Sequence, residues 1–187
     1  MRAATWFLIA LSLTIGIEGV ATQVTQAVQL RDGTVYFVQP PSLVSATTTY
    51  KGVNVWGATY YFTISLPENA GEPLQRVTIT QREGAENIRY DLDNTRAFVG
   101  TSARKGSQLT LGAVTRTRET RTVSVNFDPP VTPGQTVTIA LRPVKNPSFS
   151  GVYLLGVTAF PVGEKSHGQF LGFGRFQFYG NERNWFF

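Results

Sequence analysis

The chain has 187 residues, 42% of them hydrophobic and 16% charged, which is the composition of an ordinary globular domain. It contains no Cys, and this excludes disulfides, thiol nucleophiles and thiolate metal sites. The 17 Lys and Arg residues against 12 Asp and Glu leave a net charge of +5, which we interpret first as a solubility feature and only second as an attraction to anionic polymers.

Residues 1–21 predict a secretory signal peptide. Arg2 precedes an apolar run from Trp6 to Ile17, and small residues place a cleavage site after Ala21. The run is shorter than the roughly 20 residues that span a bilayer, so cleavage is favoured over a membrane anchor. A cut after Ala27 stays open. We expect an exported protein, periplasmic or extracellular at the cell surface, with no transmembrane helix in its mature chain.

The mature chain begins with polar residues 22–34, which predict a flexible lead-in, and residues 35–187 predict a single domain. Val35 to Val38 is its first strand. Ser42 to Asn54 is rich in Thr and Ser and is interpreted as a loop or ragged edge. The strongest strand pattern is Trp56 to Leu66. Its apolar face consists of Tyr60, Phe62, Ile64 and Leu66.

The segment 83–97 is ambiguous between helix and strand. Ile88 and Leu92 lie four residues apart, a spacing that places them on one face of either element. We favour a strand because Asp91 and Asp93 are poor residues for a helix interior. The helix stays open as an alternative.

Two further strands are expected at Gln108 to Val114 and Arg121 to Phe127. The run Asp128-Pro129-Pro130 is expected to end the second of them. After a turn at Pro133-Gly134, the residues Val137, Ile139 and Leu141 alternate with polar ones, which is typical of a half-buried strand.

The last strands are Val152 to Phe160 and Gly168 to Tyr179. The first is apolar on both faces, which predicts a position inside a sheet. In the second, Gly172 and Gly174 indicate a bulge or the close approach of another layer. About eight or nine strands at this spacing, without an internal repeat, predict an all-β fold: an antiparallel two-sheet sandwich, immunoglobulin-like in type.

The run Leu66 to Leu74 resembles the LPxxAGxPL signature of an uncharacterised family of exported cyanobacterial proteins, a domain of unknown function. The resemblance extends to Pro133-Gly134, to Asn146-Pro147, to Gly151–Leu154 and to Gly172–Tyr179, and it covers nearly the whole mature domain. It implies a secreted β domain in an envelope or extracellular setting. It implies no catalytic residues.

Few residues suggest catalysis, and we assign no catalytic, cofactor or metal site. His167 is the only histidine and lies in a polar loop, where a solvated side chain is the simpler interpretation. Asp91, Asp93 and Asn94 offer oxygen ligands for calcium, but the spacing of a calcium loop is incomplete, so a solvated turn is preferred.

Two groups of residues are candidates for ligand binding. One is a cluster of basic residues that would contact an anionic polymer through an outward-facing strand. The preferred alternative is that these charges prevent edge-to-edge aggregation of strands. The members of this cluster are Arg104, Lys105, Arg116, Arg118 and Arg121. The other group would stack on sugar rings, although packing within the sandwich is the commoner role of such aromatics. Its members are Trp56, Tyr61 and Trp185.

The sequence therefore predicts an exported, non-enzymatic structural or binding domain of the cell envelope. Envelope polysaccharide or another envelope protein is the expected partner, and nucleic acid is not expected because no aromatic is interleaved with the arginines. A glycan-binding module, a small outer-membrane β-barrel and a small hydrolase stay open as alternatives. The sequence leaves the oligomeric state open.

Overall fold

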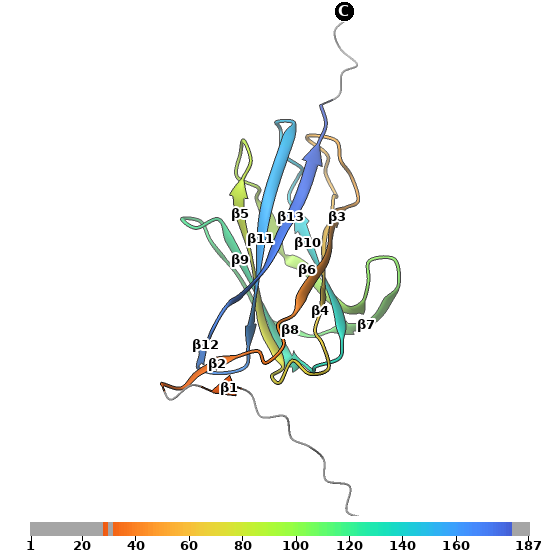
Figure 1. Ribbon diagram of the computed structural model, residues 1–187. Coiled ribbons are helices and arrows are strands. Elements are labelled where there is room, and N and C mark those ends of the chain that lie inside the picture. Colours follow the sequence, from red (N-terminus) through yellow and green to blue (C-terminus); the bar gives the residue numbers. More distant parts are fainter. Residues whose placement is uncertain (1–27, 30–31, 181–187) are drawn as a thin grey trace, which may run out of the picture.

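The computed structural model of the protein describes residues 28–29 and 32–180, and these form a β-sandwich in which the described chain contains no helix (Figure 1). The predicted signal peptide, the alternative cleavage at Ala27 and the candidate Trp185 lie outside the described residues. Of the predicted lead-in, the described part contains the short strand β1 (Val28–Gln29).

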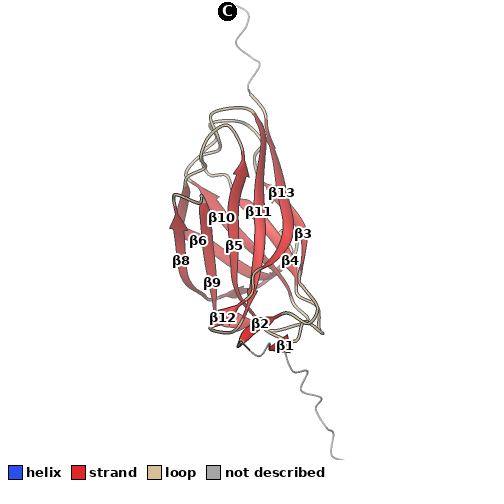
Figure 2. Cartoon of the chain, turned by 60° about the vertical axis from the view of Figure 1, so that its left-hand side comes forward, coloured by secondary structure: helices blue, strands red, loops and turns tan. Residues whose placement is uncertain are grey.

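Two five-stranded sheets form the layers of the sandwich, and all strand pairs within them are antiparallel. In the first sheet the order is β3 (Ser42–Thr48), β4 (Tyr60–Ser65), β10 (Thr136–Pro143), β6 (Tyr90–Gly100) and β7 (Lys105–Leu109). In the second sheet the order is β13 (Gln169–Phe178), β11 (Gly151–Pro161), β5 (Leu74–Glu83), β9 (Thr122–Val131) and β8 (Leu111–Thr117). In Figure 2 the strands of the second sheet cross in front of those of the first.

A small third sheet joins β1 to β2 (Thr34–Tyr36), which also pairs in parallel with β12 (Lys165–Ser166). It lies at one end of the sandwich, opposite the end at which β13 finishes (Figure 1). The described residues contain no helix that could cross a membrane.

The core lies between the two sheets and is built by the period-2 alternation of the strands. The apolar face predicted for β4 is fully buried, as are Val137, Ile139 and Leu141 of β10. Each such side chain contributes roughly 1.5–3 kcal/mol on removal from water. The prediction of an all-β, immunoglobulin-like two-sheet sandwich is confirmed, with ten strands in the main sheets rather than eight or nine.

Three predicted boundaries are wrong. Ser42 to Asn54, interpreted as a loop or ragged edge, contains the edge strand β3, on which Ser42, Val44 and Thr47 are exposed. β9 continues through Asp128-Pro129-Pro130 to Val131, because the register with β5 shifts at this point and the prolines fall in the shift. The expected strand Gln108 to Val114 is divided at Thr110, where the chain passes from the first sheet to the second.

The preference for a strand over a helix in the segment 83–97 is confirmed for residues 90–97, which belong to β6, whereas residues 84–89 form a loop. The two glycines of β13 also behave as expected. The register of β13 against β11 shifts next to Gly172, and Gly174 lies against the first sheet, where an added Cβ would come within 2.6 Å of the Ala46 Cβ. The edge strands β3 and β13 therefore meet along one side of the sandwich.

Candidate binding site at the aromatic loop end

The loops 49–59, 84–89 and 144–150 lie at the same end of the sandwich as the end of β13, at the top of Figure 1. We call this region the loop end. Four large aromatic side chains on it are more than half exposed, and exposed aromatics that are held by a rigid scaffold are typical of binding surfaces. They are Tyr50 (53% exposed), Trp56 (68%), Phe149 (60%) and Tyr179 (56%).

The buried side chain of Asn146 holds the loop end together. Its Oδ1 accepts a hydrogen bond of 3.0 Å from the Tyr60 hydroxyl in the core. Its Nδ2 donates to the carbonyl oxygens of Tyr50 (3.0 Å) and Gly52 (2.9 Å). Its backbone N–H donates to Val55 O at 2.8 Å. One side chain thus fixes the loop that carries Tyr50 and Trp56 to the loop that carries Phe149.

Further hydrogen bonds fix the remaining loops. Lys145 forms a backbone bridge with Trp56, and its Nζ donates to Asn54 Oδ1 at 3.1 Å. The Ser148 N–H donates to Glu86 Oε1, which connects the loops 84–89 and 144–150. The Tyr153 hydroxyl donates to Phe149 O at 3.1 Å. The exposed aromatics are therefore carried by backbone that is ordered before any ligand binds, which lowers the entropic cost of binding.

The tyrosines beneath the loop end stay neutral at physiological pH. Desolvation raises the pKa of Tyr60 and of Tyr90 well above the usual value. The Tyr90 hydroxyl is buried and has no hydrogen-bond partner among the described residues. These groups act as parts of the core and not as acids or bases. No group of three or more His, Cys, Asp or Glu within residues 28–29 and 32–180 is arranged to hold a metal ion.

Of the predicted stacking residues, Trp56 lies on the loop end, and Tyr61 does not. Tyr61 is half-buried on the outer face of the first sheet, beside Phe98. The Lys105 Nζ lies 5.4 Å from the centre of the Tyr61 ring and 5.5 Å from that of Phe98. The sequence pattern did not single out Tyr50, Phe149, Tyr179 or Asn146 as binding residues, although Asn146 and Tyr179 lie in segments that carry the family resemblance.

The predicted basic residues do not form one surface. Arg104 and Lys105 lie at the β6–β7 turn, and Arg118 and Arg121 at the β8–β9 turn, on opposite sides of Figure 1. The prediction that Arg116 faces outward is wrong. Its guanidinium is half-buried and donates to Ile88 O at 3.0 Å, where it closes the side of the sandwich between the two sheets.

The two weaker candidates have structural surroundings. The His167 ring stacks on Tyr36 with 4.6 Å between ring centres, next to the small third sheet. Asp91 accepts a hydrogen bond of 2.7 Å from Asn94 Nδ2, and Asp93 O accepts one of 2.8 Å from Arg96. These bonds hold an irregular part of β6, where the register against β10 shifts.

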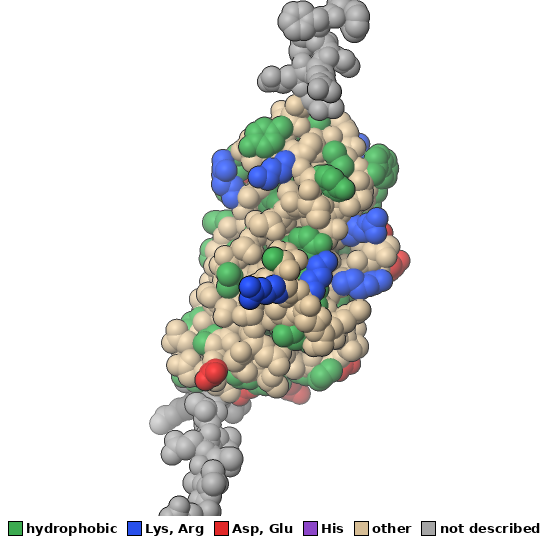
Figure 3. All heavy atoms as spheres, turned by 90° about the vertical axis from the view of Figure 1, so that its right-hand side faces the viewer, with side chains coloured by type: hydrophobic (Ala, Val, Ile, Leu, Met, Phe, Trp, Pro, Cys, Tyr) green, Lys and Arg blue, Asp and Glu red, His purple; other side chains and the backbone are tan. Residues whose placement is uncertain are grey.

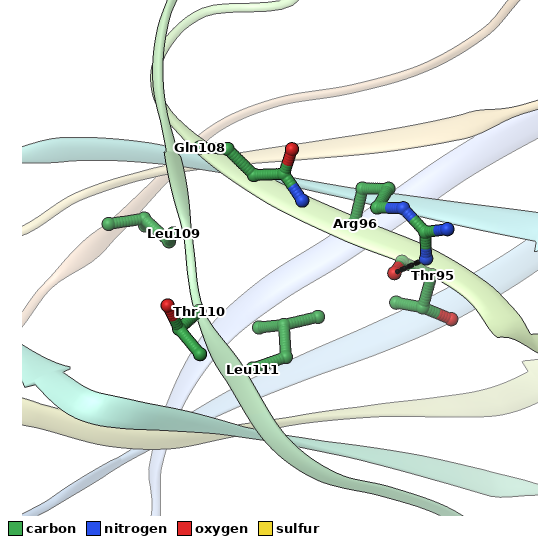
Figure 4. A pocket seen from close by; sticks show the side chains of 6 residues that line it. All are labelled: Thr95, Arg96, Gln108, Leu109, Thr110 and Leu111. Atoms are coloured by element: carbon green, nitrogen blue, oxygen red, sulfur yellow. Dashed lines mark hydrogen bonds between the residues drawn. The ribbon is translucent and has the colours of Figure 1, made fainter.

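A hollow of about 380 Å³ lies where the chain crosses between the sheets at Thr110. Figure 4 shows Gln108 and Leu111 on its one side and Arg96 on the other. The Arg96 guanidinium donates to Asp93 O and Thr95 O, both at 2.8 Å. These hydrogen bonds join Arg96 to the backbone of its own strand, β6. The hollow therefore offers less for ligand recognition than the loop end.

Comparison with known proteins places the chain in a family. The model of the family "Protein of unknown function (DUF2808)" matches residues 34–178. The chain belongs to this family. The match spans β2 to β13 and includes Tyr50, Trp56, Asn146 and Phe149 of the loop end, whereas Tyr179 follows its last residue. None of the curated proteins compared with the chain matches it.

Three solved structures are similar to this chain. An uncharacterized Nocardia farcinica protein reported with an immunoglobulin-like fold is 14% identical, with 72% of this chain and 96% of that chain covered and a TM-score of 0.41. A collagen-binding domain from a Staphylococcus aureus adhesin is 11% identical (72% and 96% covered, TM-score 0.36). The C-terminal domain of the Streptococcus pyogenes antigen I/II-family protein AspA is 12% identical (72% and 46% covered, TM-score 0.40).

Proposed function

We propose that this member of the family is an exported, non-enzymatic binding domain of the cell envelope or extracellular space, and that its loop end binds glycan. Export is supported by the signal-peptide pattern of residues 1–21. The observation that carries the proposal is the exposure of Tyr50, Trp56, Phe149 and Tyr179 on loops that the buried Asn146 fixes.

Exposed, flat and rigid rings are suited to sugar rings because each pyranose presents an apolar face of C–H groups and a rim of hydroxyls. The loop end also supplies polar groups around those rings. A hollow of about 210 Å³ between the loops 84–89 and 144–148 is lined by Glu86, Asn87, Arg89, Lys145 and Ser148, among others. Such groups would donate and accept hydrogen bonds at the edge of a bound glycan.

A glycan-array screen with the purified protein tests the proposal. Trp56→Ala is the informative variant, because Trp56 is the most exposed of the four aromatics. Phe173→Ala is the matched control, since Phe173 is 51% exposed but lies on β13, against Gly156 of the second sheet. We expect the wild-type protein and the Phe173 variant to bind the same glycans, and the Trp56 variant to lose them. The absence of any glycan bound by the wild-type protein would refute the proposal.

A further inference from the structure

A groove runs along the side of the sandwich where β3, the edge of the first sheet, meets β13, the edge of the second. Its volume of about 450 Å³ lies in the range of sites that hold small organic ligands. We call it the β3–β13 groove. The polar part of its lining consists of Thr47, Thr48, Lys51, Arg175, Gln177 and Tyr179.

The walls of the β3–β13 groove are fixed at both ends. Near the loop end, the Tyr179 N–H donates to Lys51 O at 2.8 Å, and the Val53 N–H donates to Tyr179 O at 3.0 Å. Further along, Gly174 allows β13 to lie directly against Ala46 of β3. The distance between the two walls is thereby set by backbone contacts, so the groove is preformed and its side chains need little rearrangement to bind.

The groove is basic. It contains Lys51 and Arg175, and no Asp or Glu is among the described residues that line it. Arg175 donates one hydrogen bond of 3.3 Å to Gln177 Oε1, and the side chain of Lys51 is exposed to solvent where it lines the groove. Figure 3 views the molecule from the side of the first sheet and shows Lys and Arg side chains over its upper and middle parts, with acidic ones toward the lower end and one margin.

The groove also contains an exposed ring. Tyr179 is 56% exposed and lines both this groove and a neighbouring hollow of about 660 Å³ beside Ser150 and Gly151. The combination of one ring, two cations and the amide of Gln177 fits a ligand unit with an apolar face, hydroxyls and an anionic group. A single-stranded nucleic acid fits less well, because it needs successive rings for successive bases.

We propose that the β3–β13 groove binds a carboxylated or sulfated sugar residue of an anionic polysaccharide. Arg175 and Lys51 bind the anionic group, Tyr179 stacks on the sugar ring, and Gln177 binds a hydroxyl. This inference rests on the proposed function and names its glycan class. It also differs from the sequence-based prediction, which placed anion binding at Arg104, Lys105 and the β8–β9 region.

Calorimetric titration of the purified protein with polygalacturonic acid, and with its neutral methyl ester, separates charge from ring stacking. We expect the acid to bind more tightly than the ester and to lose affinity as salt is raised. The double variant Lys51→Gln/Arg175→Gln should bind the acid at least about tenfold more weakly, because charge-assisted hydrogen bonds contribute that factor or more. Binding of the ester should not change. Tyr179→Leu should weaken binding of both forms severalfold.

The matched control is Arg104→Gln/Lys105→Gln, which lowers the net charge by the same amount at the β6–β7 turn. It should leave the affinity for the acid within about twofold, since these side chains lie outside the groove. Equal losses in the two double variants, or no loss in Lys51→Gln/Arg175→Gln, would overturn the inference. So would competition by a thymidine oligonucleotide that binds more tightly than the acid. Glycan binding that depends on Trp56 but not on Arg175 would overturn the inference and leave the proposed function standing.

Discussion

Replacing Asn146 with Ala should destabilise the fold by about 3 kcal/mol, because the substitution removes three side-chain hydrogen bonds at once. The Tyr60 hydroxyl, on a side chain with no exposed surface, would be left without an acceptor, which costs ~1–3 kcal/mol. The carbonyl oxygens of Tyr50 and Gly52 lie in a surface loop where water replaces the lost donor, so each adds about 0.5–1 kcal/mol.

Urea denaturation measures this cost directly. With a slope of roughly 2 kcal/mol/M for a domain of this size, the midpoint should fall by about 1.5 M. Asn87→Ala is the control, because Asn87 is exposed on the adjacent loop and makes no side-chain hydrogen bond within the described chain. In a Tyr60→Phe background the cost of Asn146→Ala should be smaller by about 1–2 kcal/mol, since no Tyr60 hydroxyl is left without an acceptor. An unchanged cost in that background, or a midpoint equal to that of the Asn87 variant, would refute this role of Asn146.

Three other outcomes follow from the structure. Tyr90→Phe should leave the free energy of unfolding unchanged or raise it by up to about 1 kcal/mol, because it removes a buried hydroxyl that has no partner among the described residues. A decrease of more than about 1 kcal/mol in the free energy of unfolding, measured by urea denaturation, would contradict this. Burial raises the pKa of Tyr60 and Tyr90, so both stay neutral in the folded protein while unfolded tyrosines ionise near pH 10. The free energy of unfolding should therefore be level up to about pH 9 and fall above about pH 10. A profile that stays level to about pH 12 would contradict this expectation. Gly174→Ala should destabilise by about 1–3 kcal/mol by overpacking β3 against β13, whereas Gly180→Ala, with open space around it, should have no effect on the thermal midpoint.

The fold class could be predicted from the sequence because period-2 alternation reports burial directly. The residues of β4 and β10 show this, since every apolar residue of the predicted face is buried. Edges were harder to predict. β3 lacks a regular alternation of apolar residues because its register with β4 shifts at Val44, which is exposed, and β9 continues through two prolines because a register shift accommodates them. Neither effect is a property of the local sequence alone.

The candidate site could be predicted only in part, because it is formed by segments far apart in the chain. Trp56 was identified by residue type, but its neighbours Phe149 and Tyr179 join it only through the contacts of Asn146 and of the end of β13. Arg116 shows the opposite error. Alternation with polar residues suggested an outward side chain, whereas its pairing with Val123 places it on the inner side of the sheet.

Glycan binding at the loop end can be measured with the polysaccharide that the protein would meet in the cell. The most direct test is retention of the purified protein on immobilised envelope polysaccharide from its own host cell, measured for the wild-type chain and for Trp56→Ala at low and high salt. We expect the wild-type protein to be retained at low salt and the variant to be retained much less. Equal retention of both proteins, or no retention of the wild-type protein at either salt concentration, would contradict the claim.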